Sequence, residues 1–163
     1  MRRIALGLVS AACSTVLAAS PALADSPHFQ FARNTLDSSG ALTTSFKEVG
    51  LGTGTTSIRI TVTAQATAVY QCFNNGGNHP KAKNKETLQG DAIASGDFPV
   101  RHGQTTGSLM LGPLGPGDFT CPPGQTLFLQ SVSYSGIFVS DAAGHNLHAT
   151  PDPIFNNNLH IRV

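Results

Sequence analysis

The amino-acid sequence predicts an all-β protein that folds as one sandwich of roughly seven to nine strands. The clearest sign is the segment 57–73, in which apolar and polar residues alternate. This alternation has a period of two over the eleven residues 58–68, which a helix cannot satisfy because its faces repeat every 3.6 residues. Gly and Pro break the other apolar stretches into short pieces, and no stretch shows a helical period, so a sandwich is favoured.

Further strands are predicted on both sides of this central segment. Residues 28–33 and 41–49 flank a turn at 37–40, a pattern that predicts a hairpin. The phase of alternation changes between Leu129 and Val132, which indicates a β-bulge. The remaining predicted strands are 87–95 at a sheet edge, 106–111, 126–139 and 158–163.

Small residues follow one another along the buried face of the central strand, at Ala64, Ala66 and Ala68. They predict close approach by bulky side chains of the facing sheet, because alanine leaves room that a packed core must fill. The candidate bulky residues are Phe128, Tyr134 and Phe138. On the last strand, Leu159, Ile161 and Val163 are predicted to face the core.

The first 24 residues have the pattern of a cleavable signal peptide. Arg2 and Arg3 precede an uncharged apolar stretch, and Pro21 breaks that stretch before the small residues Ala22 and Ala24. Cleavage is therefore predicted after Ala24, leaving a single domain at 25–163 in the extracellular space.

Three alternative interpretations fit the first 24 residues less well. A membrane anchor needs about 20 apolar residues, and this stretch is shorter and is broken by Pro21. Twin-arginine export lacks the usual residues around Arg2 and Arg3, and a lipoprotein cysteine at Cys13 lacks the expected Leu at Ser10. No other stretch could span a bilayer, so no membrane association is predicted.

Two cysteines, Cys72 and Cys121, remain once Cys13 leaves with the signal peptide. In an oxidising compartment two cysteines most simply form one disulfide, and the alternative is a free thiol at either position. Cys72 continues the buried phase of the central strand, so the bond should join strands across the core. Immunoglobulin-type sandwiches are cross-linked in this way, and the prediction is an immunoglobulin-like architecture, although the chain has no Trp.

The charge balance excludes some classes of partner. Removal of the signal peptide takes two of the ten basic residues, which leaves eight against nine acidic residues. Nucleic acid needs a concentrated basic face, and anionic lipid needs a polybasic segment. Neither partner is predicted, and the oligomeric state is left open.

The polar loop 74–86 is the most unusual segment of the chain. Its lysines alternate, so in an extended conformation they would project from one side and could bind an anion or a carboxylate-bearing polymer. The alternative is a solvated loop in which lysine maintains solubility and protects a sheet edge. The candidate ligand-binding residues are Asn74, Asn75, His79, Lys81, Lys83 and Lys85.

Histidines near the end of the chain could gather a metal ion. His145 and His148 lie near Asp141 and Asp152, and His160 lies on the last predicted strand. Zinc sites use three or four ligands at known spacings, and His-x-x-His without the helical motif around it is also typical of exposed loops. We therefore predict no metal site and no cofactor, and leave open whether the three histidines come together.

Catalytic patterns are weak throughout the sequence. Glu48 and Glu86 are its only glutamates, and nearly all of the aspartates lie in turn contexts. No Gly-x-Ser-x-Gly elbow, phosphate-binding loop or dinucleotide fingerprint is present. Sugar-stacking aromatics are also sparse, because the chain has no Trp and only two Tyr.

Three segments carry a resemblance to a known group of proteins. They are 46–52 (Phe-Lys-Glu-Val-Gly-Leu-Gly), 70–77 (Tyr-Gln-Cys-Phe-Asn-Asn-Gly-Gly) and 121–125 (Cys-Pro-Pro-Gly-Gln). Over roughly residues 27–141 the chain resembles small secreted proteins of actinobacteria that have no assigned activity. The resemblance implies export and supplies no catalytic residues.

The sequence is compatible with two functions. The first is a non-enzymatic extracellular binding or surface-associated module, with a cell-wall polymer or an extracellular protein as its partner, acting through loops at one end of the sandwich. The second is a small secreted hydrolase that uses Glu48 or Asp141 together with a histidine.

Overall fold

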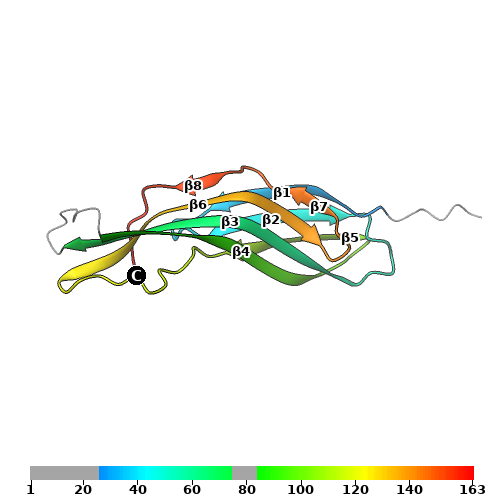
Figure 1. Ribbon diagram of the computed structural model, residues 1–163. Coiled ribbons are helices and arrows are strands. Elements are labelled where there is room, and N and C mark those ends of the chain that lie inside the picture. The colour runs from blue at the N-terminus through cyan, green and yellow to red at the C-terminus, as the bar shows by residue number, and fades with distance from the viewer. Residues whose placement is uncertain (1–25, 75–83) are drawn as a thin grey trace, which may run out of the picture.

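The computed structural model describes residues 26–74 and 84–163, which form nine β-strands and no α-helix (Figure 1). This confirms the all-β prediction, and the signal-peptide segment lies outside the described residues. The strands are β1 (His28–Leu36), β2 (Leu42–Val49), β3 (Ser57–Asn74), β4 (Lys85–Pro99), β5 (Gln104–Leu111), β6 (Gln125–Asp141), β7 (Asn146–His148), β8 (Ile154–Asn156) and β9 (Ile161–Arg162).

The strands form two antiparallel sheets. The smaller sheet has the order β1-β2-β5, and the larger has the order β4-β3-β6-β7, with β8 and β9 also paired to β6. In Figure 1 the strands of the small sheet run along the large sheet, with β3 and β6 extending over the length of the molecule. One hydrophobic core includes Leu42 and Phe46 from the small sheet and Ile60 and Val62 from the large one. The two-sheet architecture is therefore confirmed, and its immunoglobulin-like class stays a prediction.

Strict alternation determines the inner face of β3. Every second residue from Ile60 to Cys72 is buried, as the sequence predicts. The prediction that Phe128, Tyr134 and Phe138 face the β3 alanines from the other sheet is wrong, because all three lie on β6, which pairs with β3 in the same sheet. Tyr134, for example, lies directly beside Ala66. Phe138 points outward, with 43% of its surface exposed.

The predicted bulge in β6 is confirmed. Val69 pairs with Ser131 and Tyr70 with Leu129, so Gln130 is the extra residue. A second irregularity follows at Gly136 and Ile137. There the backbone N–H groups donate to the carboxylate of Asp152, at 3.1 Å and 2.8 Å respectively.

Three short strands cover the free edge of β6. β7 pairs with residues 138–140, β8 with 132–134 and β9 with 128–129. Leu159 is buried as predicted, but Val163 is 60% exposed, although its backbone N–H donates to the carbonyl of Leu127 at 3.1 Å. The prediction that Val163 faces the core is therefore wrong.

A disulfide joins Cys72 to Cys121, as predicted. Cys72 is fully buried on β3, whereas Cys121 lies outside the strands, in the connection between β5 and β6. The prediction that the bond joins two strands across the core is therefore wrong. The Tyr70 hydroxyl donates to the carbonyl of Leu114 at 2.6 Å in the same connection. The long segment 112–124 is thus held against β3 at two points.

Within the described ranges, the structure contains no helix with the length and hydropathy that a membrane crossing requires.

Candidate functional site

The candidate binding loop is described only at its two ends. Asn74 is the last residue of β3 and Lys85 is the first of β4, and both side chains are exposed. The other candidates lie outside the described residues: Asn75, His79, Lys81 and Lys83. The anion site at this loop stays a prediction.

The three candidate histidines have separate partners along β6. His145 pairs with Asp141, and His148 Nε2 lies 2.5 Å from Asp152 Oδ2. The ring of His160 stacks on Phe128, with 4.1 Å between the ring centroids. The structure therefore does not bring these histidines to one point.

A different cluster forms around Glu48. The buried positions of β2 alternate, and Glu48 continues the inward phase of Leu42, Thr44 and Phe46. The residue is fully buried, and neither of its carboxylate oxygens has a hydrogen-bond partner in the part of the chain that the structure describes. Buried polar groups in proteins are nearly always paired, so this side chain calls for an explanation.

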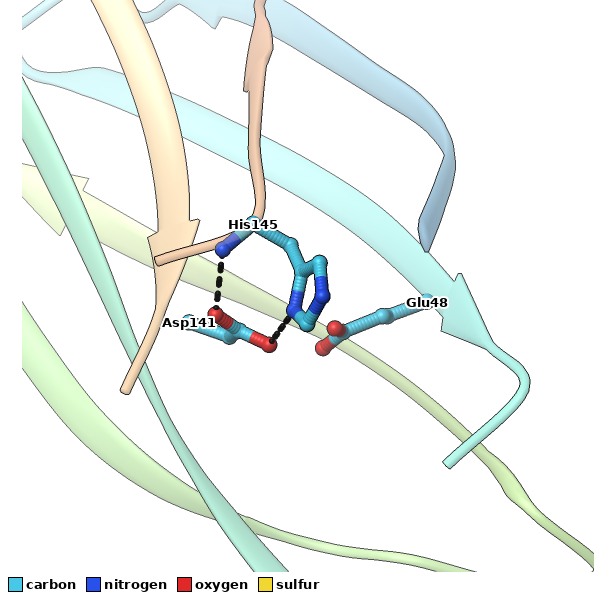
Figure 2. Close-up of side chains that lie close together, drawn as sticks. All are labelled: Glu48, Asp141 and His145. Carbon is cyan, nitrogen blue, oxygen red and sulfur yellow. Dashed lines mark hydrogen bonds and ion pairs between the residues drawn. The ribbon is translucent and has the colours of Figure 1, made fainter. Parts of the chain in front are cut away.

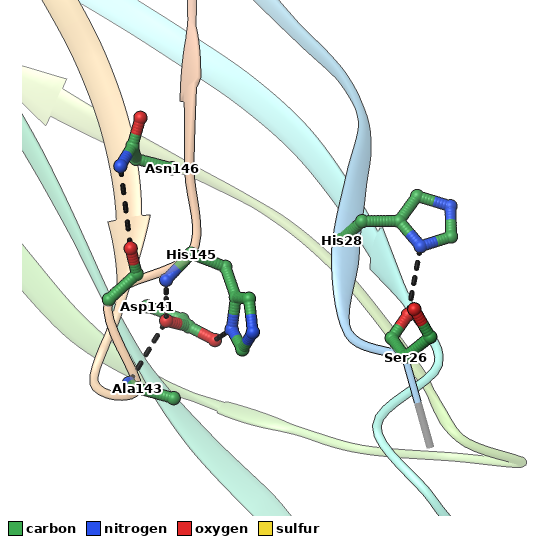
Figure 3. Close-up of polar contacts among 7 residues, drawn as sticks. Ser26, His28, Asp141, Ala143, His145 and Asn146 are labelled. Carbon is green, nitrogen blue, oxygen red and sulfur yellow. Dashed lines mark hydrogen bonds and ion pairs between the residues drawn. The ribbon is translucent and has the colours of Figure 1, made fainter. Parts of the chain in front are cut away.

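Asp141 faces Glu48 from the end of β6 (Figure 2). Its Oδ1 accepts hydrogen bonds from the backbone N–H of Ala143 at 2.9 Å and of His145 at 2.8 Å. Its Oδ2 lies 2.7 Å from His145 Nδ1, which donates to it. Figure 3 shows how these bonds, with Asn146 donating to the carbonyl of Gly144, fix the turn between β6 and β7.

The two carboxyl groups have opposite pKa shifts. Burial, together with the neighbouring Asp141, raises the pKa of Glu48 to about 7. Burial also acts to raise the pKa of Asp141, but hydrogen bonds, first from His145, outweigh it and leave that pKa below its usual value. Near neutral pH the cluster therefore holds a charged Asp141 next to a Glu48 that changes charge easily.

Ligand atoms of Glu48, Asp141 and His145 all lie within 4.8 Å of one another. The sequence-based hypothesis of a hydrolase named Glu48 or Asp141 with an unspecified histidine, and the structure brings both acids to His145. The side chain of His145 is 39% exposed and that of Asp141 is fully buried. Because both carboxylates lie beneath the surface, the cluster can hold a proton or a small ion, but a substrate bond cannot reach them in this conformation.

A second feature is a basic pocket on the outer face of the small sheet. It has a volume of about 420 Å³ and is lined by Lys47, Pro99, Arg101, His102, Gln104, Thr105 and Thr106. Within the described parts of the chain, its lining includes two permanent positive charges and an imidazole, but no carboxylate. Among the described residues, neither Lys47 nor Arg101 forms an ion pair. The pocket therefore presents uncompensated positive charge to solvent.

The pocket forms where the chain passes from the large sheet to the small one. Arg101 and Gln104 exchange backbone hydrogen bonds of 2.9 Å and 3.1 Å, which close a two-residue turn. Both central residues have positive φ, 52° at His102 and 70° at Gly103. Positive φ is uncommon outside glycine, and here it places the histidine at the rim of the pocket.

Sequence reasoning missed this pocket because its residues come from two distant parts of the chain, Lys47 and the segment 99–106. Lys47 lies beside Thr106 in the β2–β5 ladder, and the turn at 101–104 closes the end. The signals that could have found it are the His-Gly pair as a hairpin turn and the outward phase of Lys47 in β2.

Searches of protein families, curated proteins and solved structures find nothing that matches this chain.

Proposed function

We propose that the protein is an exported, non-enzymatic binding protein that takes an anionic ligand in the pocket of Lys47, Arg101 and His102. One observation carries the proposal: these basic side chains line one open pocket in which no carboxylate neutralises them. An anion with several acceptor oxygens would bind the guanidinium and ammonium groups through charge-assisted hydrogen bonds.

The size of the pocket indicates the kind of ligand. Its volume of about 420 Å³ lies in the range of small-molecule sites and fits one or two sugar-sized units. Gln104 and Thr106 add an amide and a hydroxyl group to the lining, which suit a hydroxylated ligand. The hydroxyl of Thr105 is buried and donates to the carbonyl of Pro99 at 3.0 Å. We therefore propose a carboxylate- or phosphate-bearing unit of an extracellular polymer, such as a cell-wall polymer.

Several observations support an extracellular location. The first 24 residues have the pattern of a signal peptide with predicted cleavage after Ala24. The Cys72–Cys121 disulfide fits an oxidising compartment. A disulfide and two extended sheets make a durable frame for a binding surface.

The test is co-sedimentation of the oxidised, untagged protein with cell walls of its producer. We expect depletion from the supernatant that soluble wall polymer or added salt reverses, because the attraction is electrostatic. Full recovery in the supernatant at low salt would overturn the proposal of a wall polymer. Capture of an extracellular protein instead would identify the other class of partner.

Two variants assign the binding to the pocket. Lys47→Gln and Arg101→Gln should each weaken binding by about tenfold, which corresponds to the loss of one charge-assisted hydrogen bond. Arg59→Gln is the matched control, because Arg59 is an exposed cation of the other sheet that pairs with Asp97 at 3.2 Å. An equal loss in all three variants would show unspecific charge attraction and would contradict the pocket assignment.

A further inference from the structure

We propose that Glu48, Asp141 and His145 form a site for a divalent transition-metal ion, which joins the two sheets at one end of the sandwich. The proposal is independent of the anionic ligand, since Glu48 faces the core and the basic pocket lies on the opposite face of β2.

The carboxylate of Glu48 has no hydrogen-bond partner among the described residues. The residue is fully buried. Figure 2 shows its carboxylate directed at the Asp141–His145 pair. A buried carboxylate without a partner destabilises a fold, whereas a cation placed between it and Asp141 would satisfy both charges.

The donor atoms of the cluster suit a transition-metal ion. Two carboxylate oxygens and one imidazole nitrogen suit Zn²⁺ and similar transition ions, because Ca²⁺ and Mg²⁺ prefer shells made only of oxygen. The ligand atoms already lie within 4.8 Å of one another. Zinc bonds of about 2.0–2.2 Å require separations of up to about 4 Å, so small side-chain rotations would close the shell.

The strands and the turn that carry the three side chains form a rigid frame. Glu48 comes from β2 of the small sheet, Asp141 from β6 of the large sheet, and His145 from the turn that follows β6. Two backbone N–H groups hold Asp141 Oδ1, which leaves Oδ2 directed at the cluster. The sites of the three donors are therefore fixed before an ion arrives, and little order has to be created on binding.

An ion can reach the cluster from one side. The side chains of Glu48 and Asp141 are buried, while that of His145 is 39% exposed. An ion can therefore enter from the histidine side, and a water molecule on that side would complete a four-coordinate shell. Three protein ligands with one open position are typical of zinc sites that exchange their fourth ligand.

The first experiment is a titration of the oxidised, untagged protein with Zn²⁺ after removal of metal with EDTA. We expect one ion bound per chain by calorimetry and a melting temperature that rises with Zn²⁺, because an ion that binds only the folded state stabilises it. Ca²⁺ at the same concentration should give a much smaller shift. Absence of Zn²⁺ binding, or equal binding of both ions, would overturn the proposal.

Variants locate the ion. Glu48→Gln should lower Zn²⁺ affinity by more than the 10–100-fold that loss of an outer-shell partner costs. It should nevertheless raise the melting temperature in EDTA, because the isosteric amide removes an unpaired buried charge. Glu86→Gln is the matched control, since Glu86 is the other glutamate and is exposed on β4. A Glu48→Gln variant that keeps the Zn²⁺ affinity of the unsubstituted protein would overturn the assignment.

A second pair of variants separates this cluster from a surface histidine. His145→Gln should lose Zn²⁺ binding and His148→Gln should keep it, although His148 also pairs with an aspartate four residues away. The reverse result would place the ion at His148 and Asp152 and overturn the proposal. Amide spectra recorded with and without Zn²⁺ should show shifts centred on Glu48, Asp141 and His145 in the unsubstituted protein.

Discussion

Lys47 and Glu48 are neighbours on β2, and their side chains lie on opposite faces of the small sheet. Lys47 lines the basic pocket, whereas Glu48 is fully buried in the acid–acid–histidine cluster. Alternation along a strand imposes this arrangement, because successive side chains point to opposite faces. The proposed anion and cation sites are thus separated by the thickness of one sheet.

The first prediction is coupling between these two sites. Two unit charges about 10 Å apart interact by about 1.7 kcal/mol at an effective dielectric constant of 20, and salt at physiological strength reduces this further. A bound Zn²⁺ should therefore raise the affinity of the pocket for an anion such as phosphate by a few-fold. Calorimetric titration with phosphate, in EDTA and in saturating Zn²⁺, measures the effect.

Two controls accompany this measurement. In Glu48→Gln the effect of Zn²⁺ on phosphate binding should disappear, because the ion no longer binds near the pocket. By thermodynamic reciprocity, phosphate should raise Zn²⁺ affinity by the same factor. A weaker phosphate affinity in Zn²⁺ would contradict the electrostatic argument.

The second prediction concerns Gly107 on β5. A Cβ atom at this position would lie 2.3 Å from Cε1 of Phe98 and 3.1 Å from Cζ of Phe46. These two rings already meet edge to face, with 4.9 Å between their centroids. Gly107→Ala should therefore destabilise the protein by about 1–3 kcal/mol, the usual cost of overpacking, as measured by urea unfolding.

The control for this prediction is Gly112→Ala, since a Cβ at Gly112 meets no atom within 4 Å. Adding Phe98→Leu to Gly107→Ala should recover part of the loss, because a smaller side chain vacates the space that the new methyl group needs. Equal stability of the two single variants would argue against a steric cause.

The third prediction concerns stability at alkaline pH. Tyr134 is 1% exposed and its hydroxyl donates to the carbonyl of Gly40 at 3.0 Å. Burial, followed by the charge of Asp37, raises the pKa of Tyr134 to about 12. The folded state thus favours the neutral phenol. This contribution is fully present below the unfolded pKa of about 10 and is lost as pH rises through about 12.

Tyr134→Phe isolates this contribution. Below pH 10 the variant should be less stable by about 1 kcal/mol, because Gly40 loses its hydrogen-bond donor. The difference should shrink and then reverse above that pH, since phenylalanine has no proton to lose. Urea unfolding of both proteins across pH 8 to 12 checks the sign, and a difference that does not vary with pH would contradict the argument.

The fourth prediction concerns the disulfide. Cys72 and Cys121 are 49 residues apart in sequence. The chain-entropy model gives a contribution of about 4 kcal/mol for a loop of this length. A protein with both cysteines replaced by alanine should lose stability of this order in urea unfolding, and added reductant should then have no further effect. A loss below about 1 kcal/mol would mean that the unfolded chain is already compact.

The sequence predicted individual strands more successfully than their neighbours. Alternation marks β3 and the inward phase of Tyr70 and Cys72 because each depends only on residues two apart. Sheet order depends on contacts between distant segments, so Tyr134 and Phe138 were assigned to the facing sheet although β6 pairs directly with β3. The alternation of Leu159 and Ile161 predicts that Val163 faces the core, but Val163 is exposed although its backbone still pairs with Leu127.

The same reasoning applies to the candidate site. The inward phase of β2 already places Glu48 on the core side, and Asp141 was recognised as a turn residue, a role that its bonds to Ala143 and His145 fulfil. That these two acids meet depends on the packing of the two sheets, which no local pattern encodes. The sequence therefore identifies the residues of the cluster one by one, but it does not predict that they lie together.

The covering of β6 by three short strands has a consequence for how the chain can vary. β7, β8 and β9 each pair with a separate part of the β6 edge, and none has more than three residues. An insertion at the exposed Asn157 and Asn158, between β8 and β9, would lengthen a surface loop without shifting the register of β7 or β8. One continuous strand would transmit a single-residue insertion along its whole length and turn its side chains to the wrong face. The segmented edge therefore lets the C-terminal region change in length while the frame that carries Glu48 and Asp141 stays fixed.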